Sequence, residues 1–202
     1  MQLDFNTLEP LERYRWLAST ITPRPIAWVS SLSADGVSNL APFSFFQVIS
    51  DDPATLLVNV NHRADGGLKD TLLNVQASGE LVIQLVSFAQ AEAMNASAAV
   101  LPYGISEFEQ CGIASLPGQR VAPPRVAGAA VAFECRVAQI QAYPAQKPNC
   151  HLIFAEVLLA HIDDAVLNEQ GRIDAHKLDL VGRLGGMAYN RTRDTFEMRR
   201  PG

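Results

Sequence analysis

The sequence lacks the short motifs that mark several common enzyme classes. It has no Gly-x-Gly-x-x-Gly after a strand and no Walker sequence, which argues against a doubly wound dinucleotide-binding sheet and against nucleotide hydrolysis. It also has no Gly-x-Ser-x-Gly and no cysteine in a recognisable catalytic signature, so nothing indicates a serine or cysteine hydrolase. We therefore assign no residue a catalytic role of its own.

Cysteine and histidine are scarce and scattered. Cys111, Cys135 and Cys150 are an odd number without Cys-x-x-Cys spacing, which predicts reduced thiols and a cytoplasmic protein. Cys150 is expected to be a small buried hydrophobe. His62, His161 and His176 are interpreted as structural, and no His/Cys pair has the spacing of a zinc site, so we expect no metal.

Long apolar runs and excess positive charge are missing as well. No run reaches about 18 apolar residues, so we expect no membrane segment, and the polar, acidic start does not resemble a signal peptide. The net charge is −5, which argues against nucleic acid as a partner. Residues 183–202 hold five arginines against two acids, and we expect this basic tail to pair with the acidic remainder or with a second subunit.

What is present is an ordinary globular composition with strong β patterning. The 202 residues are 48% hydrophobic and 18% charged, which suits one domain spanning residues 1–202. The predicted strands cover residues 26–32, 37–50, 55–61, 80–87, 128–143 and 151–162. Helices are predicted after Thr7 as N-cap, over 72–77 with Asp70 as N-cap and Gly79 as the stop, over 88–99 and 106–111, and near 174–178. This pattern predicts a mainly β protein with inserted helices, whose antiparallel strands form a closed or nearly closed barrel.

Thr22-Pro23-Arg24-Pro25 presents an arginine from a stiff backbone. The two proline rings fix φ, so Arg24 can meet a phosphate or lie against an aromatic plane at the start of a strand. The same residues also suit a simple helix-to-strand connector with a solvated arginine.

Residues 39–46 mix polar groups with aromatics. Asn39 and Ser44 alternate with Phe43, Phe45 and Phe46, and flat heteroaromatic ligands need apolar walls with a few placed polar groups. A core strand with incidental polar residues is the alternative. Pro42 within this stretch predicts a bulge or a sheet edge, because proline cannot donate to a ladder.

Arg63 and Lys69-Asp70-Thr71 surround the start of a predicted helix. Its free N–H groups and positive dipole end favour an anion, Thr71 adds a hydroxyl, and Lys69 and Arg63 add charge. An ordinary capped helix with solvated bases explains the same residues. His151 opens an apolar strand, where it either meets a second substrate or bonds to backbone.

Taken in order, these segments resemble the flavin reductase-like family. The matching residues are Thr22–Val29, Asp35-Gly36, Asn39–Phe46, Lys69–Thr71, Gly79-Glu80, Arg183–Gly186, Tyr189 and Arg200-Pro201. The resemblance implies an FMN-binding split barrel, and a homodimer with FMN near the interface. It also implies that Asn39, Ala41, Ser44 and Phe45 line the isoalloxazine and ribityl. Arg63, Lys69 and Thr71 would hold the phosphate, with Asp70 shaping the loop, Arg24 at the flavin mouth and His151 near nicotinamide.

Three functions follow from this resemblance. The first is an FMN oxidoreductase that uses NADH or NADPH, with a monooxygenase or another electron-transfer protein as a possible partner. The second is a non-enzymatic FMN carrier similar to flavoredoxin, which the unusual Asn149, Cys150 and Phe154-Ala155-Glu156 keep open. The third is an assembly module on a barrel that has lost its ligand.

Overall fold

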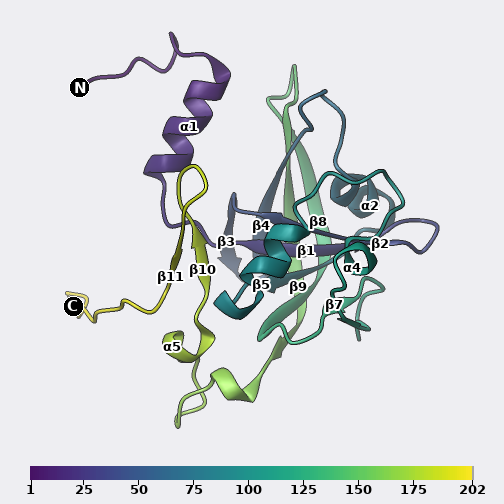
Figure 1. The fold of residues 1–202 in the computed structure, drawn as a ribbon, viewed down its shortest axis with the longest axis vertical. Helices are drawn as coiled ribbons and strands as arrows, with labels where there is room; N and C mark the ends of the chain where they lie inside the picture. The colour runs from purple at the N-terminus through teal and green to yellow at the C-terminus, as the bar shows by residue number, and fades with distance from the viewer. Residues whose placement is uncertain (202) are drawn as a thin grey trace.

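The computed structural model describes residues 1–201 and is built around one antiparallel sheet (Figure 1). The sheet has seven strands in the order β2-β1-β5-β8-β9-β4-β3. Their bounds are β1 Ala27–Leu32, β2 Ser38–Phe43, β3 Phe46–Asp51, β4 Ala54–Asn61, β5 Glu80–Leu85, β8 Val131–Tyr143 and β9 Cys150–Ile162. The mainly β architecture with inserted helices is the one that the strand pattern predicts.

The two edges of this sheet are consecutive along the chain, which forces the sheet to curl. The edge strands β2 and β3 are separated only by Ser44 and Phe45. The Asn59 N–H of β4 donates to the Phe45 carbonyl over 2.9 Å and joins the far side of the sheet to this link. The predicted single stretch 37–50 is therefore two strands, and Pro42 lies on edge strand β2, where its missing N–H costs no ladder bond.

Alternating side chains give the curled sheet two apolar faces. The main core contains Val29, Val58 and Ile83 from the strands, together with Leu72 and Val75 of helix α2, which spans Asp70–Ser78. The second cluster lies on the other face and includes the strand residues Trp28 and Leu40 together with Val86, which directly follows β5. It is covered by Met94 of α3 (Ala91–Ala96) and Phe108 of α4 (Glu107–Gln110). Both faces are thus occupied, and α2 is fixed against the barrel interior.

The remaining elements are short. They are η1 Phe88–Gln90, β6 Ser115–Leu116, β7 Arg125–Val126, η2 Asp164–Val166, α5 Ala175–Leu178, β10 Val181–Arg183 and β11 Tyr189–Arg191. The predicted helix over 88–99 is in fact η1 followed by α3. The predicted helix near 174–178 is α5, and Asp174 caps it by accepting the N–H of His176 and Lys177.

Helix α1 (Pro10–Thr20) starts two residues later than predicted. Glu9 is its N-cap, and the Thr7 hydroxyl instead donates to the Asp4 carbonyl over 2.9 Å. The helix stands away from the sheet (Figure 1), and Ala18 is its one buried residue. Its apolar side chains are largely uncovered, with Leu11 58% and Leu17 49% exposed. Apolar side chains at this spacing normally pack against something.

Part of the basic tail pairs with the chain's own acids. Arg191 binds the Asp179 carboxylate through Nε at 2.9 Å and through a second nitrogen, and its guanidinium lies 4.0 Å from the centre of the Phe88 ring. Arg193 lies 3.8 Å from the same carboxylate. Of the two partners expected for the tail, the structure shows the chain's own acids. In residues 1–201, no helix combines the length and the apolar character needed to cross a bilayer.

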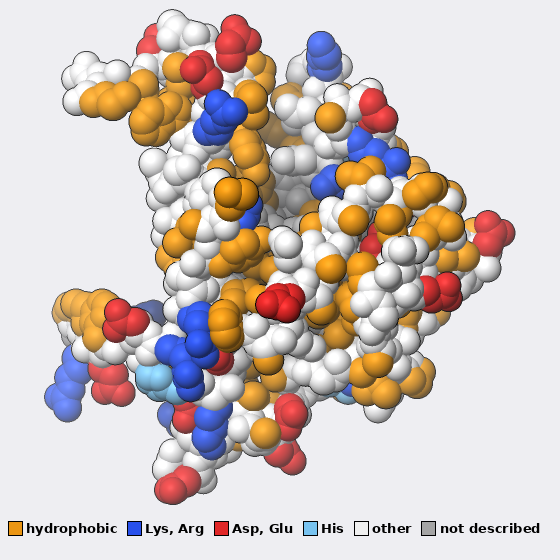
Figure 2. Space-filling model, in the orientation of Figure 1, with side chains coloured by type: hydrophobic (Ala, Val, Ile, Leu, Met, Phe, Trp, Pro, Cys, Tyr) orange, Lys and Arg blue, Asp and Glu red, His pale blue; other side chains and the backbone are white. Residues whose placement is uncertain are grey.

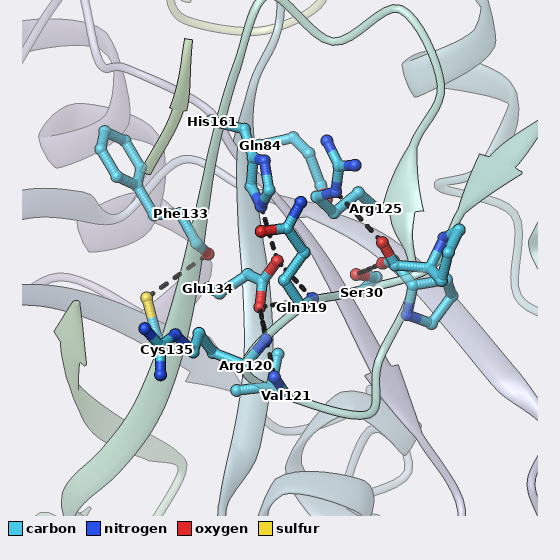
Figure 3. Close-up of polar contacts among 12 residues, drawn as sticks. Ser30, Gln84, Gln119, Arg120, Val121, Arg125, Phe133, Glu134, Cys135 and His161 are labelled. Carbon is cyan, nitrogen blue, oxygen red and sulfur yellow. Dashed lines mark hydrogen bonds and ion pairs between the residues drawn. The ribbon is translucent and has the colours of Figure 1, made fainter. Parts of the chain in front are cut away.

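A buried carboxylate organises the loop between β6 and β7 (Figure 3). The Glu134 side chain of β8 accepts the backbone N–H of Gln119, Arg120 and Val121 and contacts His161 Nε2 at 2.6 Å. Burial alone would raise the pKa of Glu134, but the N–H of Arg120, the His161 contact and the other two N–H groups outweigh it and lower the pKa. His161 is therefore part of a structural contact, as predicted. All three cysteines are free, and Cys150 is buried as expected.

Candidate functional site

A cavity of about 150 Å³ opens at the beginning of α2. Its walls come from strand β2, from the loop and helix start at 63–71, from the turn after α3 and from α4. The lining residues are Asn39, Ala41, Pro42, Arg63, Lys69, Asp70, Thr71, Ser97–Leu101 and Glu107. The structure thus brings together six of the residues singled out in the sequence, Asn39, Ala41, Arg63, Lys69, Asp70 and Thr71.

The helix start supplies donors that point to an anion. The N–H groups of Leu72 and Leu73 already bond to the Lys69 carbonyl at 2.9 and 3.1 Å. This leaves the N–H groups of Asp70 and Thr71 for a ligand, at the positive end of the helix dipole. Lys69 is the N-cap, so the prediction that Asp70 caps the helix is wrong. Asp70 is the first helical residue, and its carboxylate instead contacts the Arg63 guanidinium.

Two cations stand beside these donors. Lys69 Nζ lies 5.3 Å from the centre of the Phe43 ring. Burial, followed by the nearby Arg63 charge, lowers the pKa of Lys69. An ammonium that is partly desolvated next to another cation gains from a bound anion, because the anion offsets both costs.

Asn39 and Thr71 are joined inside the wall. Asn39 Nδ2 donates to Thr71 Oγ1 over 2.9 Å and also contacts Ser31 Oγ at 3.3 Å. Asn74 Nδ2 donates to the same Ser31 hydroxyl over 3.1 Å. Because the Thr71 oxygen already accepts, its own O–H can donate to a ligand. The network ties β1, β2 and α2 together at the cavity.

A second cavity of about 140 Å³ adjoins the first, and both include Pro42 and Lys69. Its lining residues are Tyr14, Pro42, Phe43, Ser44, Phe45, Asn59, Asn61 and Lys69. Ser44 and Phe45 thus line the cavity that adjoins the one lined by Asn39 and Ala41. In the space-filling view, a hollow opens between α1 and the α2 side of the molecule, with Lys and Arg side chains gathered on the α2 side (Figure 2). The two cavities combine a cationic end with an aromatic end.

Arg24 lines neither of the two cavities. Its guanidinium donates to the carbonyls of Ala18, Ile21 at 2.9 Å and Leu184 at 3.1 Å. Its Nε is 3.4 Å from Ser44 Oγ, and its Cζ is 5.7 Å from the centre of the Phe45 ring. Arg24 therefore anchors the end of α1 and the link that carries Ser44 and Phe45, and it touches the groove only through those two residues.

His151 also lies apart from both cavities. Its Nδ1 is 3.2 Å from His62 Nε2, and the two rings stack with centres 5.2 Å apart. Burial and then the nearby His62 lower the pKa of His151. This histidine pair joins β9 to the end of β4, and the sequence offers no signal that His62 and His151 meet.

Several lining residues were not found from the sequence. Tyr14, Asn59 and Asn61 reach the groove from α1 and β4, and Asn59 and Asn61 share one face of the alternating strand. The turn at 97–101 and Glu107 come from segments interpreted only as helix and loop. The alternation of 55–61 was a usable signal for the two asparagines, whereas the position of Glu107 depends on how α4 packs.

Comparison with known proteins decides the family. Residues 19–191 match the model of the flavin reductase like domain. The chain belongs to the flavin reductase-like family. An uncharacterized protein of Deinococcus radiodurans is 41% identical over 204 residues, which is 98% of this chain and 88% of that protein. The curled sheet is the split barrel of this family.

Two solved structures of flavin reductase-like proteins are closely similar. Nitrilotriacetate monooxygenase component B from Bacillus cereus superposes with a TM-score of 0.93 and 30% identity, over 98% of each chain. The 2-nitrobenzoate 2-nitroreductase NbaA of Pseudomonas fluorescens superposes with a TM-score of 0.89 and 28% identity, over 100% of this chain and 96% of that one.

The residues present in the groove fit a flavin mononucleotide. A phosphomonoester requires N–H donors and cations, which the helix start and the side chains of Lys69 and Arg63 supply. A flat tricyclic ring requires apolar walls with a few polar groups, which Pro42, Phe43 and Phe45 with Ser44 and Asn59 supply.

Proposed function

We propose that this protein binds FMN in the groove formed by the two adjoining cavities and uses it as an oxidoreductase that takes reducing equivalents from NADH or NADPH. The observation that carries the proposal is the continuity between the cationic start of α2 and the aromatic segment 42–45, joined through Pro42 and Lys69. Arg63, Lys69 and Thr71 would hold the phosphate. Asn39, Ala41, Ser44 and Phe45 would line the ribityl and ring.

The chemistry of such an enzyme matches the absence of a catalytic motif in the sequence. Bound FMN accepts a hydride and needs no side-chain acid or base to do so. The protein's part is to bind, orient and exclude water, and to place N–H groups and cations near developing negative charge. Lys69 lies at the junction of the two cavities and supplies one such cation.

The purified protein tests this directly. It should be yellow, or become yellow with FMN, and NADH or NADPH should bleach it without oxygen. Comparing the two nicotinamides under the same conditions identifies the donor. A protein that is colourless after incubation with excess FMN and removal of the unbound flavin by gel filtration would contradict the proposal.

An FMN electron carrier is the second candidate, and the position of His151 favours it. His151 pairs with His62 and lines neither cavity, so the residue expected to meet nicotinamide is already engaged. In a carrier, dithionite or a reduced ferredoxin bleaches the bound FMN and neither nicotinamide does. An assembly module is the third candidate, and it would bind no flavin at all.

A homodimer is part of the proposal. The exposed apolar residues of α1 need a cover, and Tyr14 of the same helix lines the second cavity. A second copy on α1 would therefore border the proposed flavin site. The likeness to a monooxygenase component B suggests an oxygenase partner as the electron acceptor.

A further inference from the structure

Glu107 is a buried acid at a site that otherwise favours anions. It is the first residue of α4, its side chain is turned inward, and the residue is 5% exposed. It lines the same cavity as Arg63, Lys69 and Thr71. A carboxylate beside a phosphate site needs a reason, because like charges in a partly desolvated space repel.

One carboxylate oxygen of Glu107 has a clear structural partner. Its Oε2 accepts the Leu40 N–H over 2.8 Å. Leu40 lies in β2, an edge strand of the sheet, and an edge strand presents N–H groups that no neighbouring strand pairs. Leu40 also stands between Asn39 and Ala41, two residues of the cavity wall. Glu107 thus fixes the backbone of that wall from the side that no strand covers.

The charges around the cavity balance only when Glu107 is counted. Lys69 and Arg63 bring two positive charges, and Asp70 and Glu107 bring two negative ones. Arg63 is already in contact with Asp70, which leaves Lys69 as the other cation of the cavity lining. Burial raises the pKa of Glu107, the Leu40 N–H and its own N–H oppose that rise, and the Asp70 charge adds to it.

This balance limits how much phosphate the cavity accepts. A single phosphomonoester at the helix start meets Lys69 and the free N–H groups. A flavin dinucleotide adds a second phosphoryl group beyond the first. The other lining residues away from the helix start, Ser97–Leu101 and Glu107, include no cation. A second phosphoryl group next to Glu107 finds negative charge and no further cation among the lining residues.

We propose that Glu107 is a positioning and specificity residue of the cofactor site, which holds β2 through Leu40 and selects the mononucleotide FMN over the dinucleotide FAD. This inference rests on the proposed flavin site. Glu107 does not touch the reacting ring, and its effect is on which flavin binds.

The test is a pair of binding titrations with FMN and with FAD, followed by flavin fluorescence. The wild-type protein should bind FMN more tightly than FAD. Glu107→Gln keeps an oxygen that accepts the Leu40 N–H but removes the charge. We expect it to lower the preference for FMN about tenfold, mainly through tighter FAD binding, which is roughly the effect of one modest charge interaction.

Two further variants separate specificity from folding. Glu109 is an exposed acid on the same short helix, and it does not line this cavity. Glu109→Gln should therefore keep the wild-type ratio of FMN affinity to FAD affinity. Glu107→Ala also removes the Leu40 contact, and we expect it to weaken both flavins. A general loss of structure lowers both affinities and leaves their ratio unchanged.

The outcomes distinguish this inference from the proposed function. If wild type binds FMN, and Glu107→Gln keeps its preference within about twofold of the wild-type value, the role of Glu107 is wrong and the flavin site stands. A wild-type preference for FAD would overturn the inference in the same way. If wild type binds neither flavin, the proposed function fails and this inference fails with it.

Discussion

Asn39 Nδ2 donates to Thr71 Oγ1 over 2.9 Å, and this bond joins the edge strand β2 to the first turn of α2. Both residues are buried, Thr71 almost completely. The bond orients the Thr71 hydroxyl toward the cavity and sets the distance between the two elements that the proposed phosphate and ribityl would contact. A polar pair this deep is costly when one partner is removed.

Removing the Asn39 side chain should therefore destabilise the ligand-free protein. Asn39→Ala leaves the Thr71 and Ser31 hydroxyls short of a partner, and we expect the free energy of unfolding in urea to fall by about 1–3 kcal/mol. Asn6→Ala, at an exposed position, is the control and should change it by less than about 0.5 kcal/mol. A loss for Asn39→Ala as small as that of the control would show that the buried network does not hold β2 to α2.

Arg24 should matter for stability more than for phosphate binding. Arg24→Ala leaves the carbonyls of Ala18, Ile21 and Leu184 without their donor, so we expect a loss of about 2–4 kcal/mol and a lower Tm. Arg199→Ala, on the exposed tail, should leave the Tm unchanged. If Arg24→Ala keeps the wild-type Tm, these hydrogen bonds do not stabilise the fold, and the Arg24 side chain is available to bind a ligand.

Glu134 should make stability depend on pH in the acid range. Its pKa is lowered from 4.5 in the folded protein, so its contribution is present above the pKa of the unfolded chain and is lost as pH falls through the lower folded value. The difference in unfolding free energy between wild type and Glu134→Gln should be largest near pH 7 and shrink below about pH 4.5.

Urea titrations of both proteins between about pH 3 and pH 8 measure that difference, because this range spans the ordinary pKa of a carboxyl group. Glu169→Gln, an exposed acid, should show no such dependence. A pH-independent difference for Glu134→Gln would mean that the ionised form is not what holds the loop at 119–121.

The exposed face of α1 should be an interface between two copies. In one copy Leu17 is 49% exposed, so Leu17→Glu should fold normally, but a dimer would have to bury the new charge. We expect light scattering after gel filtration to show a dimer for wild type and a monomer for Leu17→Glu. Leu116→Glu alters a leucine of similar exposure, 43%, on the short strand β6 and should stay dimeric. A monomeric wild type would contradict the proposed dimer.

Sequence reasoning recovered the fold because its signals are local. The predicted strands at 55–61, 128–143 and 151–162 correspond to β4, β8 and β9, and Pro42 indicated an edge strand. It grouped Arg63, Lys69, Asp70 and Thr71 at the helix start because anion sites at helix termini depend on adjacent residues, whereas Asn39 and Ala41 came from the family resemblance. It did not identify Lys69 as the N-cap of α2, because Asp70 is a residue type that suits an N-cap. In the structure the Asp70 carboxylate instead accepts a hydrogen bond from Arg63.

Contacts between distant segments were beyond the sequence. The acceptors of Arg24 lie on α1 and at Leu184, and only the folded chain brings them together. The same holds for the pairing of His62 with His151 and for the hydrogen bond from the Leu40 N–H to the Glu107 carboxylate. In each case a polar side chain meets a partner set by the curl of the sheet and the packing of a short helix.

The central claim is that the start of α2 holds a phosphate while segment 42–45 holds a flat ring. Riboflavin shares the ring and ribityl of FMN but has no phosphate, so parallel titrations with both compounds isolate the phosphate contribution. Wild type should bind FMN at least about tenfold more tightly than riboflavin, as expected for one or more charge-assisted contacts. Lys69→Ala combined with Thr71→Ala should remove most of that difference. Equal affinity of the wild-type protein for FMN and riboflavin would contradict the account.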